Sequence, residues 1–482
     1  MKVFSIRWLH LFICGLLLIP SASLFGQIRS AKVQLADTLD MTPIRVNRIY
    51  ILGNKKTKRS IITRELSMQE GDTVPAYRLP VLFKEDKNKV YNTQLFNSVS
   101  IEKLQLDSTS IDLLVKVDER WYFYPSLLFK LSDRNFNDWW VNRNRDLRRV
   151  NYGFKLFQYN FRGRNELLRL VAQFGFETQL ELSYRIPYIE PSQRHGLTFD
   201  VGYSERKNMA YQTVDHLPIF TRSNKILRTS VGGSIIHSYR PSFYTYHYTS
   251  LGLYSINLAD TIPELNPNYF GDGSTTQRAF RLTYTFTRDF RDNRNYPLSG
   301  DFYYFQVHKV GLGIIDDVDI WRFRGNYSKY FNLSNGFYMA NSIEGMIATP
   351  KDQPYNNYTS LGFGPTLVRG YELELIEGYQ YLLTKNALRK RLWKSESDIS
   401  SVMPLEQFQK IPFIFYGNIF FDAGWVKNYP NYEQSSRLSN KLIYGIGLGI
   451  DFITINDLTT RFEYSYNAEN EFNFFLNFKA AF

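Results

Sequence analysis

The sequence predicts a mainly β fold: a sixteen-stranded antiparallel transmembrane β-barrel, preceded by one small β-α-α-β-β domain. From about residue 120 onward, segments of roughly ten residues carry apolar side chains at every second position, which is the period of a β-strand. Within Ala279–Arg288, for example, four apolar residues alternate with arginine and threonine: Phe280, Leu282, Tyr284 and Phe286. Aromatic residues make up 17% of the chain, with 7 Trp, 35 Tyr and 38 Phe. Such a share is typical of a membrane barrel with aromatic girdles.

The N-terminal residues 1–26 predict a secretory signal peptide. Two basic residues precede an apolar core from Leu11 to Ile19, and proline and small residues follow it. Cys14 is the only cysteine of the chain and lies in this apolar core. The mature chain is therefore expected to contain no thiol, which excludes disulfides and cysteine-ligated metals. Residues 27–42 are expected to form a polar linker.

The net charge of +12 does not indicate a nucleic-acid partner. Lysine and arginine are scattered through the strand-like segments instead of forming one basic patch. No apolar run of 18 or more residues follows the signal, so the sequence predicts no spanning helix. Export combined with alternating strands predicts the bacterial outer membrane, with its lipid as one partner.

Residues 43–119 predict a separate small domain that precedes the barrel. Apolar residues alternate in one segment at its start and in two at its end, and two stretches between them have helical spacing. In order, the expected elements are a strand at Val46–Leu52, helices at Lys58–Leu66 and Tyr77–Leu95, and strands at Val99–Leu104 and Ile111–Val117. About 75 residues are enough for one small core.

Residues 120–482 predict the barrel itself, and its strands can be counted. Sixteen segments are expected to be strands: Tyr122–Leu131, Val150–Tyr159, Asn165–Phe176, Gln179–Ile186, Leu197–Ser204, Leu227–Ser238, Phe243–Ser255, Arg278–Arg288, Asp301–Val310, Ile320–Phe331, Gly336–Ile347, Tyr379–Leu392, Pro412–Trp425, Leu442–Phe452, Leu458–Tyr466 and Phe472–Phe482. Four of the connections that follow odd-numbered strands are long, and several that follow even-numbered strands are short. This asymmetry is expected of a barrel with long outer loops and short periplasmic turns.

Several motifs resemble one family. Ile49–Asn54, Gly71-Asp72 and Leu95–Val99 are similar to a POTRA domain, the periplasmic module of the BamA/TamA outer-membrane assembly superfamily. Four stretches of the barrel region are similar to that superfamily's barrel: Arg288–Asn293 with Pro297 and Gly300, Val368-Arg369-Gly370-Tyr371, Phe420–Gly424, and the C-terminal strand with Phe474, Phe478 and Phe482.

The resemblance implies a brace between the sixth outer loop and the thirteenth strand, with Arg369 against Asp422. The residues agree, because Asp422 shares the parity of Asn418 and Gly424 and should therefore point inward. A guanidinium and a carboxylate pair in a bidentate manner, so neither charge would be left unpaired in a confined lumen. Gly370 permits the turn, and Tyr371 can pack on the wall. The family's glutamate on strand twelve has no counterpart near Asn386–Arg389, where this chain has Ala387.

The resemblance also implies a function without catalysis or cofactor: assembly of β-barrel proteins in the outer membrane, or translocation of proteins across it. The POTRA domain would lie in the periplasm and bind unfolded or nascent proteins through a strand edge. The first and last strands would form a separable seam. Accessory periplasmic or lipoprotein subunits are possible partners. Secretion of one dedicated partner protein and a passive porin are the alternatives, although a porin would gain nothing from a POTRA domain or a loop that plugs its lumen.

A hydrolase is the competing class, and the sequence offers little for it. The five histidines of the mature chain have no metal-ligand spacing: His195, His216, His237, His247 and His308. Ser234 and His237 lie three residues apart in one strand, which places them on opposite faces. We therefore expect no catalytic, metal or cofactor site.

Overall fold

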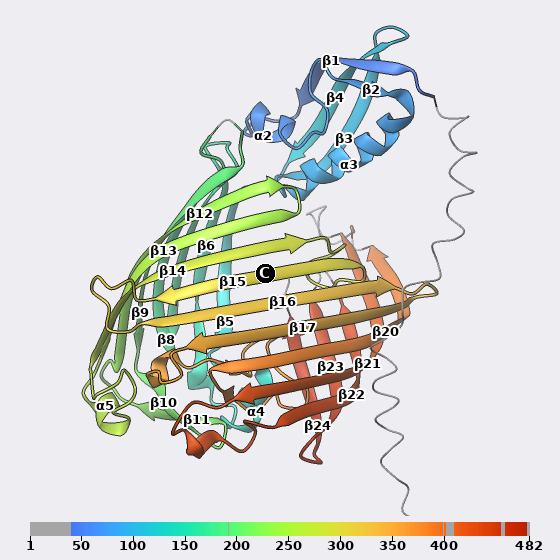
Figure 1. Cartoon of the computed structure of the whole chain (residues 1–482). Helices are drawn as coiled ribbons and strands as arrows, with labels where there is room; N and C mark the ends of the chain where they lie inside the picture. The colour runs from blue at the N-terminus through green and yellow to red at the C-terminus, as the bar shows by residue number, and fades with distance from the viewer. Residues whose placement is uncertain (1–39, 191, 399, 402–408, 455–457, 480–482) are drawn as a thin grey trace, which may run out of the picture. The chain divides into compact units, whose positions relative to one another are not determined.

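The computed structural model describes residues 40–190, 192–398, 400–401, 409–454 and 458–479 (Figure 1). The predicted signal peptide, nearly all of the predicted linker and Phe482 lie outside the described residues. The chain divides into two compact units, one of residues up to 54 with 62–118, the other of residues 55–61 with 119–482. Each unit is described by itself below.

The small domain has the predicted β-α-α-β-β order with one addition. Its elements are β1 (Pro43–Leu52), α2 (Arg59–Thr63), β2 (Thr73–Pro75), the 3-10 helix η2 (Ala76–Arg78), α3 (Leu79–Asn92), β3 (Phe96–Gln105) and β4 (Ser110–Glu119). The short strand β2 was not predicted. The sheet order is β2-β1-β4-β3, so β3 is an edge strand, and β1 runs parallel to β4. Alternate residues of the strands and the apolar face of α3 bury the core, which includes Val46, Val90, Phe96 and Val115.

The large unit contains one sixteen-stranded sheet, and each predicted strand is present. The strands are β5 (Phe123–Leu131), β6 (Val150–Phe161), β7 (Glu166–Gly175), β8 (Glu177–Ile186), β9 (His195–Arg206), β12 (Arg228–Ser242), β13 (Thr245–Leu258), β14 (Thr276–Asp289), β15 (Gly300–Val310), β16 (Ile320–Asn332), β17 (Phe337–Thr349), β20 (Gln380–Asp398), β21 (Lys410–Lys427), β22 (Leu442–Ile453), β23 (Thr459–Asn467) and β24 (Phe472–Lys479). Neighbours in this sequence order are hydrogen-bonded, in a series that begins at β5 and ends at β24.

Side chains alternate between an exposed outer face and an inner face, as a barrel in lipid requires. On β22, Tyr444, Ile446, Leu448 and Ile450 are exposed. The residues of opposite parity face the lumen, and among these Gly445 and Asp451 are buried. We call the ends of the barrel the loop end, with the connections after odd-numbered strands, and the turn end, with the connections after even-numbered strands.

The loop end has more structure than the sequence predicted. The connection 207–227 forms a hairpin of β10 (Asn208–Val214) and β11 (Leu217–Arg222). The connection 350–379, which we call loop six, contains the short pair β18 (Ser360–Leu361) and β19 (Ile376–Glu377). Short helices lie in other loops, including α4 (Phe136–Val141) and α5 (Thr261–Leu265). Among the residues that the structure describes, no helix is long and apolar enough to cross a membrane.

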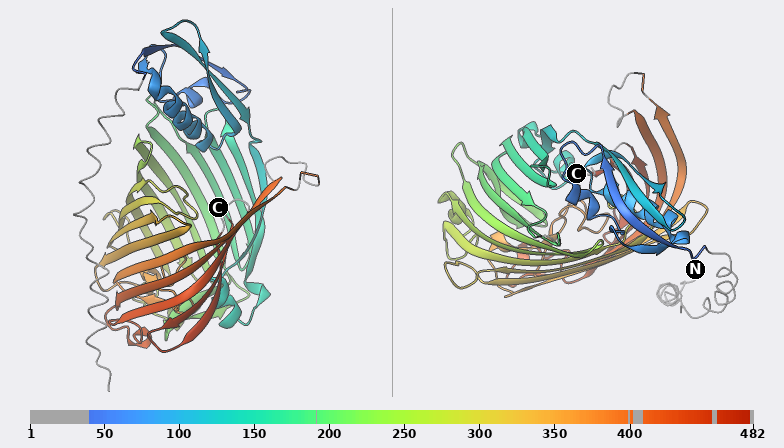
Figure 2. Two further views of the ribbon diagram at one scale, coloured as in Figure 1. Left: turned by 90° about the vertical axis from the view of Figure 1, so that its right-hand side faces the viewer. Right: turned by 90° about the horizontal axis from the view of Figure 1, so that it is seen from above.

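At the turn end, β20 and β21 are longer than predicted. The sequence predicts that these strands end at Leu392 and begin at Pro412, whereas they pair as far as Asp398 and Lys410. The pairing of β17 with β20 stops at Lys390. β20 and β21 therefore continue as a two-stranded ribbon beyond β17 (Figure 2). A register shift lies between Arg391 and Trp393. A β-bulge of this kind bends a ribbon away from the sheet.

Candidate functional site

The motif Val368–Tyr371 lies in loop six, and its contacts are with strands β20 to β23 on the inner face of the barrel. Gly370 has φ +99°, a conformation that residues with a side chain rarely adopt. The turn directs the Arg369 side chain to the wall, while Val368 and Tyr371 are buried in an apolar cluster with Leu361 and Ile443. The sequence motif is therefore a compact turn whose charged and apolar side chains both face the barrel.

Arg369 and Asp422 form a bidentate ion pair. Nε of Arg369 donates to Oδ2 of Asp422 at 2.7 Å, and Nη2 donates to Oδ1 at 2.6 Å. The backbone N–H of Arg369 also donates to Oδ2, at 3.3 Å. Asp422 has no exposed surface and only 7% of Arg369 is exposed. Burial alone would lower the pKa of Arg369, but Asp422 and then Glu463 hold that pKa above its ordinary value.

A second carboxylate reaches the same guanidinium from β23. Nη1 of Arg369 lies 3.4 Å from Oε1 of Glu463, which is also buried. Nη2 donates in addition to the backbone carbonyl of Asn386 on β20, and the guanidinium carbon lies 4.0 Å from the ring centre of Phe420. β20, the twelfth strand of the barrel, thus contributes a carbonyl. The additional acid comes from β23, the fifteenth strand. The sequence prediction missed Glu463, although its inward parity beside Phe462 and Tyr464 could have indicated it.

Glycines on the wall make room for the docked loop. A Cβ atom at Gly445 of β22 would lie 1.8 Å from the carbonyl oxygen of Arg369. A Cβ atom at Gly424 of β21 would lie 2.6 Å from Cγ2 of Val368. Separations this short do not occur between real atoms, so neither position tolerates a larger residue without displacement of loop six. This explains Gly424, which the resemblance indicated, and it adds Gly445.

Glu372, which follows the motif directly, is a buried acid that the sequence prediction did not include. Its Oε2 accepts the N–H of Gly370 at 2.8 Å, so the side chain closes the turn. Its Oε1 has no hydrogen-bond partner among the described residues. Burial, and then the charge of Glu463, raises the pKa of Glu372 well above its ordinary value. Glu372 therefore closes the turn, while Asp422 and Glu463 are the carboxylates that contact the Arg369 guanidinium.

The predicted turn between the eighth and ninth strands of the barrel, residues 290–299 between β14 and β15, also reaches the inner wall. The Tyr296 hydroxyl donates to Oδ2 of Asp451 at 2.6 Å, and Nε of Arg461 donates to Oδ1 of Asp451 at 2.7 Å. Asp292 accepts the backbone N–H groups of Leu298 and Ser299 and so fixes the turn. A second charge pair, of the buried Asp451 and the partly exposed Arg461, thus lies on β22 and β23, toward the turn end.

The predicted C-terminal signal is described in part. Phe474 and Phe478 are 64% and 57% exposed on the outer face of β24. Phe482 lies outside the described residues. Asn473 and Asn477 take the opposite parity and face the lumen.

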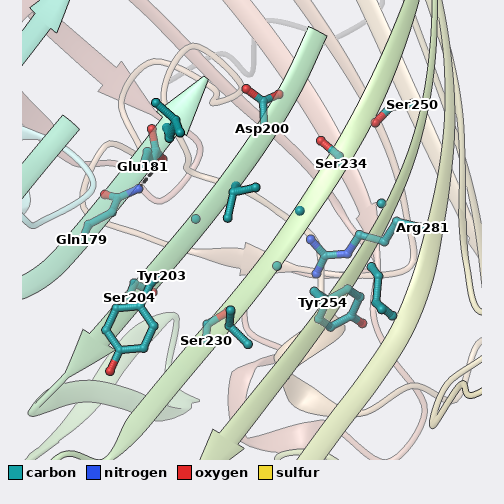
Figure 3. Close-up of a pocket in the computed structure, with 18 of the residues that line it drawn as sticks. Gln179, Glu181, Asp200, Tyr203, Ser204, Ser230, Ser234, Ser250, Tyr254 and Arg281 are labelled. Carbon is teal, nitrogen blue, oxygen red and sulfur yellow. Dashed lines mark hydrogen bonds between the residues drawn. The ribbon is translucent and has the colours of Figure 1, made fainter. Parts of the chain in front are cut away.

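A polar cavity of about 560 Å³ lies against the inner wall of β8, β9, β12, β13 and β14 (Figure 3). Its lining is small and hydrophilic, with Ser230, Ser234 and Ser250 beside Asp200 and Arg281 (Figure 3). The guanidinium of Arg281 lies 3.6 Å from the ring centre of Tyr254. The lumen therefore keeps water-accessible space on the side away from the Arg369 site.

The histidine side chains make hydrogen bonds within the protein. Nε2 of the buried His216 accepts the N–H of Leu438 at 2.9 Å, and burial lowers the pKa of His216 to about 4. His195 and His237 lie 2.9 Å apart through their ring nitrogens. Among the described residues, no group of three or more His, Cys, Asp and Glu side chains could hold a metal ion.

Comparisons with known proteins agree with this architecture. Residues 160–478 match the model of the Omp85 superfamily domain, and residues 44–120 match the POTRA model, described as a surface antigen variable number repeat. A search of curated proteins by sequence finds no match.

Two solved structures have the same fold. BamA from Haemophilus ducreyi lacking POTRA domains 1–3 is 17% identical, with a TM-score of 0.58 over 90% of this chain and 83% of that one. CdiB from Escherichia coli is 12% identical, with a TM-score of 0.55 over 91% of this chain and 76% of that one.

The matched barrel model covers well over half of the 482 residues. The barrel and the POTRA domain together place the protein in the outer membrane, among proteins of insertion or translocation in general. The chain belongs to the Omp85 superfamily.

Proposed function

We propose that this protein assembles or inserts β-barrel proteins at the outer membrane, through a seam between β5 and β24 that can separate. The buried Arg369–Asp422 pair carries the proposal. Two charges are removed from water there, and they hold loop six against the inner wall of the barrel. Buried ion pairs contribute little net stability, and their best-attested use is to specify one arrangement. A passive channel has no need to fix loop six in one arrangement.

The two units have different proposed roles. We propose that residues 1–26 are a signal peptide, that 43–119 form a periplasmic POTRA domain after a short linker, and that 120–482 form the barrel. The edge strand β3 of the POTRA sheet would bind an unfolded client by addition of a strand. The outward aromatic residues of the barrel would contact lipid. Since members of this family are transport and assembly proteins, no catalysis or cofactor enters the proposal.

A photoreactive residue at Ser100 tests the client-binding edge. Ser100 lies on β3 and is partly exposed. Cross-linking in cells followed by mass spectrometry should recover outer-membrane proteins. The matched control is a photoreactive residue at Lys116, which is exposed but lies on the central strand β4, between β1 and β3. Equal capture from Ser100 and Lys116, or no outer-membrane protein from Ser100, would contradict the proposed edge.

Translocation through the lumen is the second candidate, and the cavity in Figure 3 favours it. Its small polar lining offers a path that an extended chain could follow. A Ser234→Cys variant labelled with a bulky thiol reagent would fill this cavity. Lumenal transport would stop after labelling, whereas insertion at the seam would continue. Because the only cysteine lies in the predicted signal, the reagent should label one position.

A further inference from the structure

A short segment of the first long loop contacts both loop six and the last strand. This loop, residues 132–149, connects β5 to β6 and contains α4. We call the segment Arg134–Asp138 the clasp. It comes directly after the first strand of the barrel, and its contacts link two segments that follow it by more than 200 residues.

The clasp first binds the backbone of loop six. Nη1 of Arg134 donates to the carbonyl oxygens of Glu374 at 2.8 Å and Gly362 at 3.2 Å. Nη2 donates to the carbonyl oxygen of Leu373 at 2.7 Å. The next residue, Asn135, donates through Nδ2 to the carbonyl oxygen of Glu372 at 2.7 Å.

These contacts fix the shape of loop six on both sides of its short strand pair. The Arg134 side chain is almost completely buried and lies 3.4 Å from the Asp138 carboxylate. A planar guanidinium that donates to three carbonyls holds their relative positions far better than a lysine could. The first long loop is therefore a second brace of loop six, at residues other than the pair between Arg369 and Asp422.

The clasp also binds the edge of β24. The backbone N–H of Leu476 donates to Oδ1 of Asn137 at 3.1 Å, and Nδ2 of Asn137 donates to Oδ1 of Asn477 at 3.3 Å. The Phe136 ring meets the Phe478 ring edge-on at 5.7 Å. Successive N–H groups of a strand point to opposite edges. The Leu476 N–H thus points away from β23, and a side-chain amide occupies the place that a neighbouring strand's carbonyl would take.

The contact of the clasp with β24 leads on to the Arg369 site. Nδ2 of Asn477 donates to Oε2 of Glu463 at 3.1 Å, and Oε1 of Glu463 lies 3.4 Å from Arg369. A continuous path therefore runs from Asn137 through Asn477 and Glu463 to Arg369. Displacement of β24 would disturb the counter-charge of Arg369, and release of loop six would remove the carbonyls that hold Arg134.

We propose that the clasp is a latch: it holds β24 in position while loop six is docked, and its release frees the β24 edge for a strand. The positioning residues are Arg134, Asn135 and Asn137. This inference deepens the proposed function, because it rests on a seam that opens during the reaction. The occupant that competes with Asn137 is an extended strand of the client, since a neighbouring strand offers a backbone carbonyl as the acceptor at that edge.

Hydrogen exchange of the mature protein in lipid nanodiscs tests the latch without any client. Asn137→Ala should speed exchange of the Leu476 amide about tenfold, because one protecting hydrogen bond is lost. Asn137→Asp keeps the acceptor and should preserve most of the protection. The matched control is Asn142→Ala, since the Asn142 side chain bonds to Asp138 inside the first long loop. Unchanged exchange at Leu476 in Asn137→Ala would overturn the latch.

A reversible lock then tests whether release is required. A disulfide between Asn137→Cys and Asn477→Cys would hold the clasp on β24. Insertion of a barrel client into vesicles should stop in the oxidised protein and return on reduction, and full insertion with the disulfide intact would overturn the requirement. Absence of insertion by the unmodified protein would refute the proposed function instead, and hydrogen exchange would still decide the latch.

Discussion

Arg369 is held by two carboxylates that differ in geometry. Asp422 accepts two hydrogen bonds from the guanidinium, at 2.6 and 2.7 Å, while Glu463 is 3.4 Å away. The loss of one member of a buried pair leaves an uncompensated charge, which costs about 3–5 kcal/mol. The Asp422 contact should therefore dominate, and Glu463 should tune it.

The first prediction is a double-mutant cycle on this pair. Arg369→Ala and Asp422→Ala should each abolish most activity, and the double variant should be little worse than either, because the pair is already broken. Glu463→Gln should have a smaller effect. Client insertion rates measure the cycle, with Arg148→Ala as control, since its pair with Asp146 is largely exposed. Additive losses would show that Arg369 and Asp422 act separately.

The second prediction concerns the wall beneath the motif. Gly445→Ala should displace loop six, because the new Cβ would lie 1.8 Å from the carbonyl oxygen of Arg369. The matched control is Gly325→Ala on β16, where the nearest atom, the carbonyl oxygen of Tyr304, would be 3.9 Å away. Protease cleavage within loop six should rise for Gly445→Ala and stay at the wild-type level for Gly325→Ala. Equal cleavage in both variants would contradict the docked position.

At the loop end, one buried carboxyl group joins several connecting segments. Glu377 of β19 accepts hydrogen bonds from the Tyr432 hydroxyl at 2.7 Å and from Thr213 of β10 at 3.1 Å. Three separate connections thus meet at this side chain. Burial raises the pKa of Glu377 to about 7, although both hydrogen bonds oppose the increase.

The third prediction follows from the sign of this shift. The folded pKa lies above the ordinary value of 4.5, so the stabilisation by Glu377 is complete below about pH 4.5 and is lost as pH rises through about 7. The protection factors of amides in residues 209–214 and 429–438, which correct for the intrinsic rise of exchange with pH, should fall between pH 6.5 and 8.

His216 acts in the opposite direction, because its folded pKa of about 4 lies below the ordinary value of 6.5 and its contribution to stability therefore grows as pH rises to about 6.5. The range is set above pH 6.5 so that most of this opposing contribution is already complete. Glu374 acts in the same direction as Glu377, since burial and then Glu471 raise its pKa to about 7. Glu377→Gln should therefore reduce the pH dependence and not remove it. A pH dependence identical to that of the wild-type protein in Glu377→Gln would contradict the assignment.

The strands could be predicted from the sequence more completely than the loops, for a physical reason. A barrel strand in lipid alternates over about ten residues, so its period is readable even where its ends are not. The β10–β11 hairpin was missed because its two-residue turn, Asp215-His216, lacks the glycine that signals such turns, although both residues have positive φ. The Arg391–Trp393 bulge likewise interrupts the alternation, which hid the longer ribbon.

The residues of the site also differ in how far the sequence could predict them. The parity of Asp422 and the arginine-glycine turn could be read from neighbouring residues, together with the resemblance. Glu463, Gly445 and the clasp depend on which strands lie beside loop six in space. No local pattern connects Asn137 with Leu476, because this contact exists only after the first long loop and the last strand have come together.

For the whole molecule, the fourth prediction is that the mature protein fractionates with the outer membrane and migrates faster in gels before boiling than after it. A strand series with paired backbone groups resists detergent until heated. Recovery as a periplasmic protein without lipid would contradict the barrel. The Arg369→Ala variant should still show the mobility shift, because the wall strands pair without loop six.

The most direct test of the central claim is insertion by the purified protein in lipid vesicles. An unfolded outer-membrane barrel is added, and its folded, heat-modifiable form is followed with time. Vesicles with the wild-type protein should form folded client faster than empty vesicles, and vesicles with the Arg369→Ala/Asp422→Ala variant should not. Client folding at the rate of empty vesicles, with the wild-type barrel itself intact, would contradict the proposed role in barrel assembly.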